Sequence, residues 1–93
     1  MISIEQQELI KELTSPYKPT YLGVFGSFAR GEQDSKSDLD ILVDFEENLD
    51  LLELIGLEQK LSERLKLKVD LITYRSLNEL IKPYIEKDLI QIF

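Results

Sequence analysis

Asp38 and Asp40 are the residues of this sequence whose type and spacing could most directly do chemistry. They open the run DLDILVDF, residues 38–45, which alternates like a β-strand. Side chains two positions apart on a strand point to the same face, with origins about 6.5–7 Å apart. Two carboxylates placed in this way can converge on one or two divalent cations. A pair of cations about 3.5–4 Å apart is the arrangement used for in-line displacement at phosphorus.

A third carboxylate would complete such a site, and Asp70 is the candidate. It interrupts the apolar run LKVDLIT, residues 67–73, where a lone acid is costly. If that strand lies beside the strand of the acid pair, Asp70 can face the same pocket. Alternatively, Asp70 is a structural acid paired with Lys68 or Arg75. The chain has no histidine and no cysteine, so the cation that fits these oxygen ligands is magnesium.

Gly26 and Ser27 end the preceding strand and could bind phosphate. Glycine lets the backbone approach a ligand closely, and the hydroxyl and amides of the turn can hold phosphate oxygens. Arg30 can reach the same phosphates with its planar guanidinium, and Lys36 is a weaker candidate. Taken singly, these residues are typical of a turn and of solvated charges.

Two named motifs are excluded. The run GSFARGEQ is not a P-loop, because no Gly-Lys-Ser/Thr follows. A calcium loop starting at Asp34 would need glycine where Leu39 stands and glutamate where Phe45 stands. An isolated Asp-x-Asp is itself more typical of a polar strand start, and Ser37 alone indicates only a hydroxyl at that position.

The composition favours one small domain, residues 1–93. A net charge of −7 repels phosphate backbones, so stable binding to duplex nucleic acid is not expected. A nucleotide bridged by a metal remains compatible with that charge, because the metal inverts the local electrostatics. The apolar runs are far too short for a membrane span, and the N-terminus is too acidic for a signal peptide, so we expect a cytoplasmic protein.

The elements that must position these residues follow from periodicity. We expect helices over residues 3–14, 50–66 and 76–93, and strands over residues 20–26, 38–45 and 67–73. On the central strand one face carries Leu39, Ile41, Val43 and Phe45, and the other carries Asp38, Asp40, Leu42 and Asp44.

Helix starts are indicated by capping residues. Ser3 with Gln6, Asp50 with Glu53, and Ser76 with Glu79 have the spacing of capping boxes. The run FARG allows at most one helical turn, and Pro83 is expected to kink or restart the last helix.

The predicted order gives an α/β (α+β) fold: a small mixed sheet of about three strands flanked by helices. Such a sheet has bare edges, which are a liability. We expect either the final helix or a partner to cover them.

Taken together, the spacing resembles the signature of the DNA polymerase β-like nucleotidyltransferase superfamily, GSxxRG followed by SDxD. The matching positions are Gly26, Ser27, Arg30, Gly31, Ser37, Asp38 and Asp40. The run from residue 68 to residue 93 resembles the tail of the minimal nucleotidyltransferases, and the whole resemblance spans residues 20–93. It implies the polymerase β-like nucleotidyltransferase fold.

The resemblance also implies roles for the acids. Asp38 and Asp40 would hold two magnesium ions. Asp70 would hold the ion that activates the attacking hydroxyl, and could help to accept its proton. The implied reaction is nucleotidyl transfer, in which a hydroxyl attacks the α-phosphorus of a nucleoside triphosphate and pyrophosphate leaves.

The implied nucleotide-binding residues are Gly26, Ser27, Arg30 and Ser37. Gly26 and Ser27 would bind the β- and γ-phosphates, with Arg30 assisting, and Ser37 belongs to the matching motif.

Single-domain members resemble the antitoxins of type VII toxin–antitoxin pairs. The resemblance implies a HEPN-domain ribonuclease toxin as partner, with AMP transferred from ATP to one of its tyrosines. Two alternatives stay open. The domain could neutralise the toxin by binding alone, with the acidic residues 44–53 mimicking RNA phosphates. It could also be a nucleotide- or metal-binding module without transfer.

Overall fold

A four-stranded sheet carries the acids, with its strands in the order β3-β2-β1-β4. In the computed structural model, which describes residues 2–93, the strands are β1 (Pro19–Phe25), β2 (Leu39–Phe45), β3 (Val69–Thr73) and β4 (Ile90–Gln91). β2 pairs with β1 antiparallel and with β3 parallel, and β4 pairs with β1 antiparallel. The mixed sheet flanked by helices is confirmed, with four strands rather than about three.

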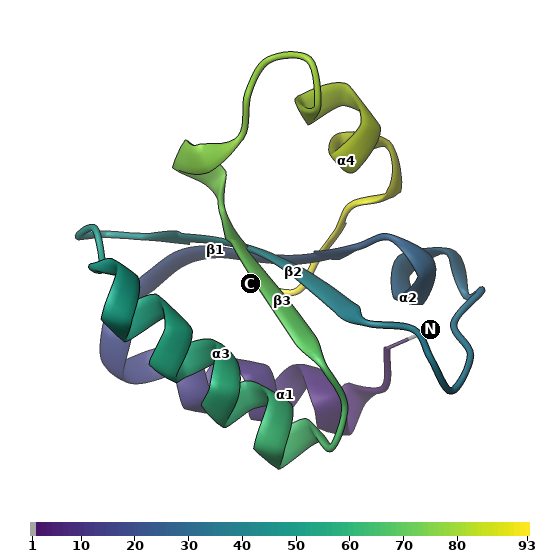
Figure 1. Cartoon of the computed structure of the whole chain (residues 1–93), viewed down its shortest axis with the longest axis horizontal. Helices are drawn as coiled ribbons and strands as arrows, with labels where there is room; N and C mark the ends of the chain where they lie inside the picture. Colours follow the sequence, from purple (N-terminus) through teal and green to yellow (C-terminus); the bar gives the residue numbers. More distant parts are fainter. Residues whose placement is uncertain (1) are drawn as a thin grey trace.

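Helices cover the sheet unequally. α1 (Ile4–Thr14) and α3 (Leu51–Leu65) lie on one face, and the shorter α4 (Lys82–Asp88) lies on the other (Figure 1). α2 (Ser27–Arg30) is a single turn directly after β1. Short 3₁₀ segments follow α1 and β3, at residues 15–17 and 74–76. No helix in the described residues 2–93 is long and apolar enough to cross a membrane.

Both long helices begin at the predicted capping boxes. The Ser3 hydroxyl accepts from the Gln6 N–H at 3.1 Å, and the Gln6 side chain accepts from the Ser3 N–H at 2.9 Å. Asp50 accepts from the Glu53 N–H at 2.8 Å, and Glu53 accepts from the Asp50 N–H at 3.3 Å. Each cap satisfies amides that a helix start leaves without partners and is worth about 1 kcal/mol.

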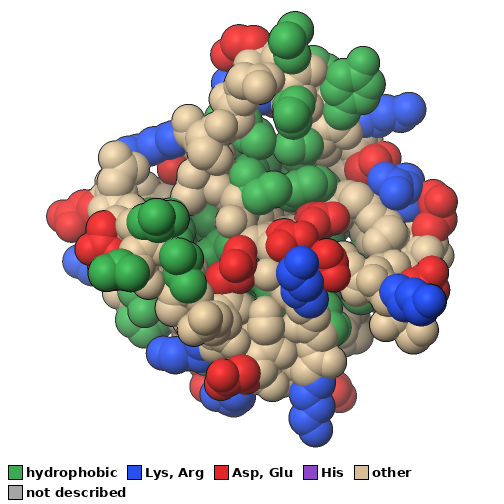
Figure 2. All heavy atoms as spheres, in the orientation of Figure 1, with side chains coloured by type: hydrophobic (Ala, Val, Ile, Leu, Met, Phe, Trp, Pro, Cys, Tyr) green, Lys and Arg blue, Asp and Glu red, His purple; other side chains and the backbone are tan. Residues whose placement is uncertain are grey.

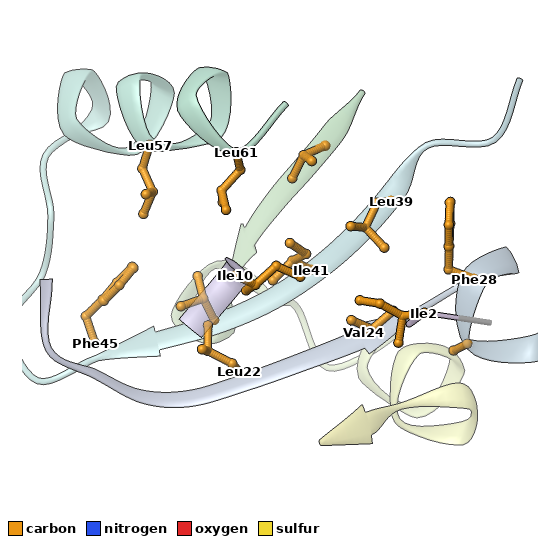
Figure 3. Packing of buried hydrophobic residues seen from close by; sticks show 13 residues of the cluster. Ile2, Ile10, Leu22, Val24, Phe28, Leu39, Ile41, Phe45, Leu57 and Leu61 are labelled. Carbon is orange, nitrogen blue, oxygen red and sulfur yellow. The ribbon is translucent and has the colours of Figure 1, made fainter. Parts of the chain in front are cut away.

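The alternation of β2 gives the strand one face that packs in the hydrophobic core and one face that carries the acids. Its buried residues pack against α1 and α3 around Ile10, Leu57 and Leu61 (Figure 3). The residues of β2 in this layer are Leu39, Ile41, Val43 and Phe45, as predicted. Because successive side chains alternate, Asp40 and Asp44 lie on the opposite face. The packed layer therefore fixes where the acids point.

The predicted start of the last helix is wrong. The Ser76 hydroxyl donates to the Thr73 carbonyl at 2.8 Å instead of capping a helix. The Asn78 side chain accepts from the N–H groups of Leu80 and Ile81, both at 3.0 Å, and so closes a turn. α4 starts only at Lys82, since an asparagine that bonds its own local backbone favours a turn over a helix.

The predicted end of that helix is also wrong. α4 ends at Asp88, and the chain continues as β4, where Ile90 pairs with Val24 of β1. The Ile92 N–H donates to the Leu22 carbonyl at 2.8 Å. The outer edge of β1 is therefore covered by a strand and not by a helix.

The outer edge of β3 differs, because no strand of the described residues 2–93 pairs with it. The Leu71 N–H donates to the Glu58 carboxylate at 2.8 Å, and the Val69 N–H donates to the Ser62 hydroxyl at 3.0 Å. Glu58 and Ser62 are four residues apart on α3, which connects β2 to β3 in a βαβ unit. Side chains of the connecting helix thus replace a neighbouring strand.

Candidate active site

Asp40 and Asp70 lie side by side on neighbouring strands. In the parallel register of β2 and β3, Asp40 is the partner of Asp70. Paired residues of neighbouring strands point to the same face, so both carboxylates lie on the face opposite α1 and α3. Figure 2 shows acidic side chains gathered in the region where β2 and β3 run together. The expected adjacency of the two strands is confirmed.

The negative charge of the neighbouring acids Asp38, Asp40 and Asp70 is incompletely balanced. Burial raises the pKa of the half-buried Asp40, and the neighbouring charges of Asp70 and Asp38 raise it further. The charge of Arg30 lowers it by a smaller contribution. Among residues 2–93, no ion pair or hydrogen bond joins the carboxylate of Asp40 or Asp70 to a cationic or donor group. An added cation would relieve this repulsion.

Asp38 contributes from just before β2, and its carboxylate is drawn to Lys68 at 3.7 Å. The Lys68 side chain is 71% exposed, so this ion pair is worth about 0–1 kcal/mol and is easily exchanged. Within the described part of the chain, no three acidic side chains form a ready-made metal-ligand cluster. A cation held by all three acids would therefore require rotation of at least one carboxylate.

Gly26 closes the site from the side of β1. Its φ of 75° and ψ of −151° belong to a region that residues with a Cβ rarely adopt. A Cβ built at this position would lie 2.4 Å from Oδ2 of Asp40. The β1–α2 turn therefore packs directly against the Asp40 carboxylate, which a larger residue at this position would have to displace. Ser27 follows at once, half-buried, as the first residue of α2.

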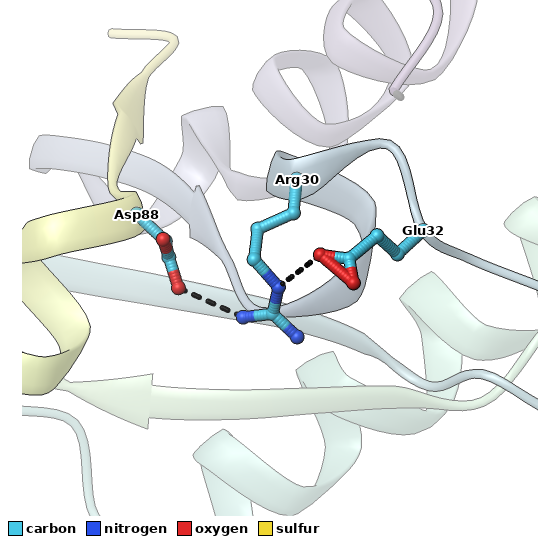
Figure 4. A network of polar contacts seen from close by, with 3 residues as sticks. All are labelled: Arg30, Glu32 and Asp88. Atoms are coloured by element: carbon cyan, nitrogen blue, oxygen red, sulfur yellow. Dashed lines mark hydrogen bonds and ion pairs between the residues drawn. The ribbon is translucent and has the colours of Figure 1, made fainter.

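Arg30 is held by two carboxylates (Figure 4). Its Nε donates to Glu32 at 2.9 Å, and its Nη1 donates to Asp88 of α4 at 2.8 Å. The two acids raise the pKa of Arg30. The arginine is close enough to the acid group to affect the pKa of Asp40. This position is compatible with the predicted role of Arg30 in phosphate binding. Its bonds to Glu32 and Asp88 were not predicted.

Ser37 is engaged in the loop before β2. Its hydroxyl accepts from the Asp34 N–H at 2.9 Å and donates to the Asp34 carboxylate at 3.3 Å. This turn sets the direction of the chain into Asp38. A contact between Ser37 and a nucleotide stays a prediction.

The alternative pairing of Asp70 is wrong in both its forms. Lys68 approaches Asp38, and Arg75 lies 3.4 Å from Asp44. Asp88 was missed altogether, because no periodicity or motif connects it to Arg30, 58 positions away. Asp88 follows Glu86 and Lys87 in an ordinary charged stretch, so the sequence offers no specific signal for it.

The sequence matches the nucleotidyltransferase domain family over residues 7–92. It is 46% identical over 82 residues to the protein adenylyltransferase MntA of Thermococcus cleftensis, covering 83% of each chain. It is 52% identical over 83 residues to a Methanocaldococcus jannaschii protein whose name gives protein adenylyltransferase as a provisional activity. That alignment covers 88% of this chain and 85% of the relative.

Solved structures agree with this assignment. A toxin–antitoxin crystal structure with AMP-PNP contains a chain with a TM-score of 0.85 and 29% identity, covering 94% of this chain and 72% of the other. A chain in the complex of a tri-AMPylated Shewanella oneidensis HEPN toxin with its MNT antitoxin has a TM-score of 0.78 and 25% identity, covering 96% and 70%. Fold, acid placement and sequence agree: this chain belongs to the nucleotidyltransferase domain family and is a nucleotidyltransferase enzyme.

Proposed function

We propose that this protein transfers AMP from ATP to a tyrosine hydroxyl of a partner HEPN toxin, in a magnesium-dependent reaction, and thereby acts as an antitoxin. The observation that carries the proposal is the placement of Asp40 beside Asp70, with no ion pair to either within residues 2–93. An acid whose pKa is raised by burial and by acidic neighbours, as that of Asp40 is, is typical of a functional site. Family membership supplies the reaction class.

Asp38, Asp40 and Asp70 would hold two magnesium ions. The fit is one of donor chemistry: three carboxylates, a residual negative charge at Asp40, and a chain without histidine or cysteine. The weak pair between Asp38 and Lys68 leaves Asp38 available. When bound, the ions would neutralise charge that develops on the phosphates and the attacking oxygen.

The remaining residues would bind and orient the nucleotide. The backbone of Gly26 and Ser27, with the guanidinium of Arg30, would hold the β- and γ-phosphates of ATP. Asp70 would accept the proton of the attacking hydroxyl. The new bond forms between that oxygen and the α-phosphorus, and the bond from the α-phosphorus to pyrophosphate breaks. Ser37 would contact the nucleotide and would also support the loop that presents Asp38.

The partner follows from the relatives, two of which are toxin–antitoxin structures, one with AMP-PNP and one with a tri-AMPylated HEPN toxin. We propose that residues 1–93 act as a single nucleotidyltransferase domain and that the toxin supplies the acceptor. Exposed apolar side chains are available for contact on α3 and around α4; they are Leu51, Leu52, Leu80 and Tyr84.

The test is transfer of label from α-labelled ATP to the purified HEPN toxin encoded with this chain, with and without magnesium. We expect labelled toxin only when magnesium is present, and no labelling by the Asp38→Asn/Asp40→Asn variant. Nucleotide binding without any labelled toxin would reject transfer and favour a binding module.

One observation favours a second candidate, neutralisation by contact alone. Glu46, Glu47 and Glu53 line a cavity of about 250 Å³ between residues 16–18 and the segment that joins β2 to α3, near the exposed Leu51 and Leu52. Such a surface could meet a basic ribonuclease without catalysis. The same double variant separates the two candidates. Toxin inhibition that survives the loss of both aspartates would favour contact, whereas loss of inhibition would favour transfer.

A further inference from the structure

The bond between Arg30 and Asp88 connects the turn after β1 to the last helix. The Nη1–Oδ2 distance is 2.8 Å, and the Asp88 side chain is 23% exposed. The other partner of Arg30, Glu32, is 63% exposed and only two positions away in sequence. An exposed ion pair is weak and mobile, whereas a more buried charged hydrogen bond fixes geometry. Asp88 is therefore the firmer of the two anchors.

The two bonds leave one end of the guanidinium available. Nε and Nη1 are engaged, and within residues 2–93 no hydrogen bond to Nη2 is found. In this orientation the charge of Arg30 acts on Asp40. The arginine side chain is 43% exposed and would lose considerable rotamer freedom on binding a phosphate. An anchor from α4 removes part of that cost before the ligand arrives.

We propose that Asp88 is a positioning residue, which holds the guanidinium of Arg30 toward the triphosphate of the nucleotide. This inference rests on the proposed function, in which Arg30 contacts the β- and γ-phosphates. Asp88 itself touches neither substrate nor metal. Its effect should therefore be confined to ligands that carry the phosphates beyond the α-phosphate.

The test compares two nucleotides on the full chain, with magnesium present. Binding of AMP-PNP and of AMP is measured by calorimetry for the wild type and for Asp88→Ala. We expect the affinity for AMP-PNP to fall about tenfold, as for other supporting contacts of a binding group. The affinity for AMP should be unchanged, which also shows that the variant is folded. In the transfer assay, KM for ATP should rise with little change in kcat.

Two controls isolate the contact. Glu86→Ala removes an acid from the same helix that has no bond to Arg30, and it should leave both affinities unchanged. In an Arg30→Ala background, Asp88→Ala should have no further effect on AMP-PNP, because the two residues act through one contact.

The outcomes separate this inference from the proposed function. Equal loss of AMP and AMP-PNP affinity, or an undiminished effect of Asp88→Ala without Arg30, would overturn the positioning role. Wild-type affinity for AMP-PNP in Asp88→Ala would overturn it as well. Failure of the wild type to bind AMP-PNP at all would instead reject the proposed function and this inference together.

Discussion

The two ends of β2 present the same residue type in opposite situations. Asp40 and Asp44 lie on one face of the strand, four positions apart, and both are half-buried. Asp44 lies 3.4 Å from Arg75, which also bonds Asn48 in the loop after the strand. Asp40 instead lies beside Asp70, and burial and its acidic neighbours raise its pKa.

The comparison shows which property marks a functional acid. An aspartate on a sheet face is common, and its interaction partners indicate whether its role is structural or functional. At Asp44 a cation balances the charge, so the acid has a sufficient structural explanation. At Asp40 the structure leaves the charge incompletely balanced, which costs stability unless a ligand compensates. Substitutions at the two ends of β2 should therefore change the free energy of unfolding by different amounts and in opposite directions.

The largest effect on stability is expected at Gly26, whose backbone packs against the Asp40 carboxylate. Gly26→Ala combines a disfavoured backbone with a Cβ 2.4 Å from Asp40, and should cost about 2–3 kcal/mol. Gly31→Ala is the reference: its φ of 73° and ψ of 22° are ordinary left-handed values, and no atom lies within 4 Å of the new Cβ. We expect about 1 kcal/mol there. Urea unfolding measures both, and equal losses would contradict the greater backbone strain and crowding at Gly26.

A smaller effect should appear when magnesium is added. A cation that binds only the folded protein stabilises it by about 1.4 kcal/mol at ten times its Kd. We expect this gain in the wild type and in Asp44→Asn, and its loss in Asp40→Asn. Thermal unfolding with and without magnesium measures it. If magnesium stabilised Asp40→Asn as much as the wild type, Asp40 would not be a metal ligand.

The smallest effect is expected from pH in protein freed of divalent cations. Because the pKa of Asp40 is raised in the folded state, the folded protein binds this proton more tightly than the unfolded chain. Ionised Asp40 therefore destabilises the fold at neutral pH, and this penalty disappears as the pH falls through the raised pKa.

The corresponding variants should move in opposite directions. At pH 7, Asp40→Asn should be more stable than the wild type, by less than about 1 kcal/mol because the group is half-exposed. This advantage should shrink toward pH 4. Asp44→Asn should be slightly less stable at pH 7, since it removes the acidic partner of Arg75. Unfolding free energies measured across this range check both signs. An advantage of Asp40→Asn that grows on acidification would contradict the unbalanced charge.

Local chemistry explains what the sequence could predict. The capping boxes at Ser3 and Asp50 need only neighbours three positions away. The phase of β2 follows from an alternation that only the buried Leu42 interrupts, and it places Asp40 opposite the core. The position of Asp70 required one further assumption, that β3 pairs with β2, which the βαβ order makes natural.

Long-range contacts explain what the sequence could not predict. β4 is a two-residue strand, too short to show a period, and it forms because β1 offers it an edge. The false capping box at Ser76 fails because Asn78 forms a competing turn that spacing alone does not reveal. The bond from Arg30 to Asp88 depends on the packing of α4 over the sheet, which no local pattern encodes.

The bonds from Glu58 and Ser62 to the backbone of β3 restrict how a partner can dock. Proteins with a free edge strand can capture an extended peptide by main-chain pairing, in a way that largely ignores the peptide's side chains. Here the amides needed for such capture are already occupied by α3. Capture of an extended peptide along the β3 edge is therefore disfavoured, and a partner that docks at this edge is selected by the side chains of its surface.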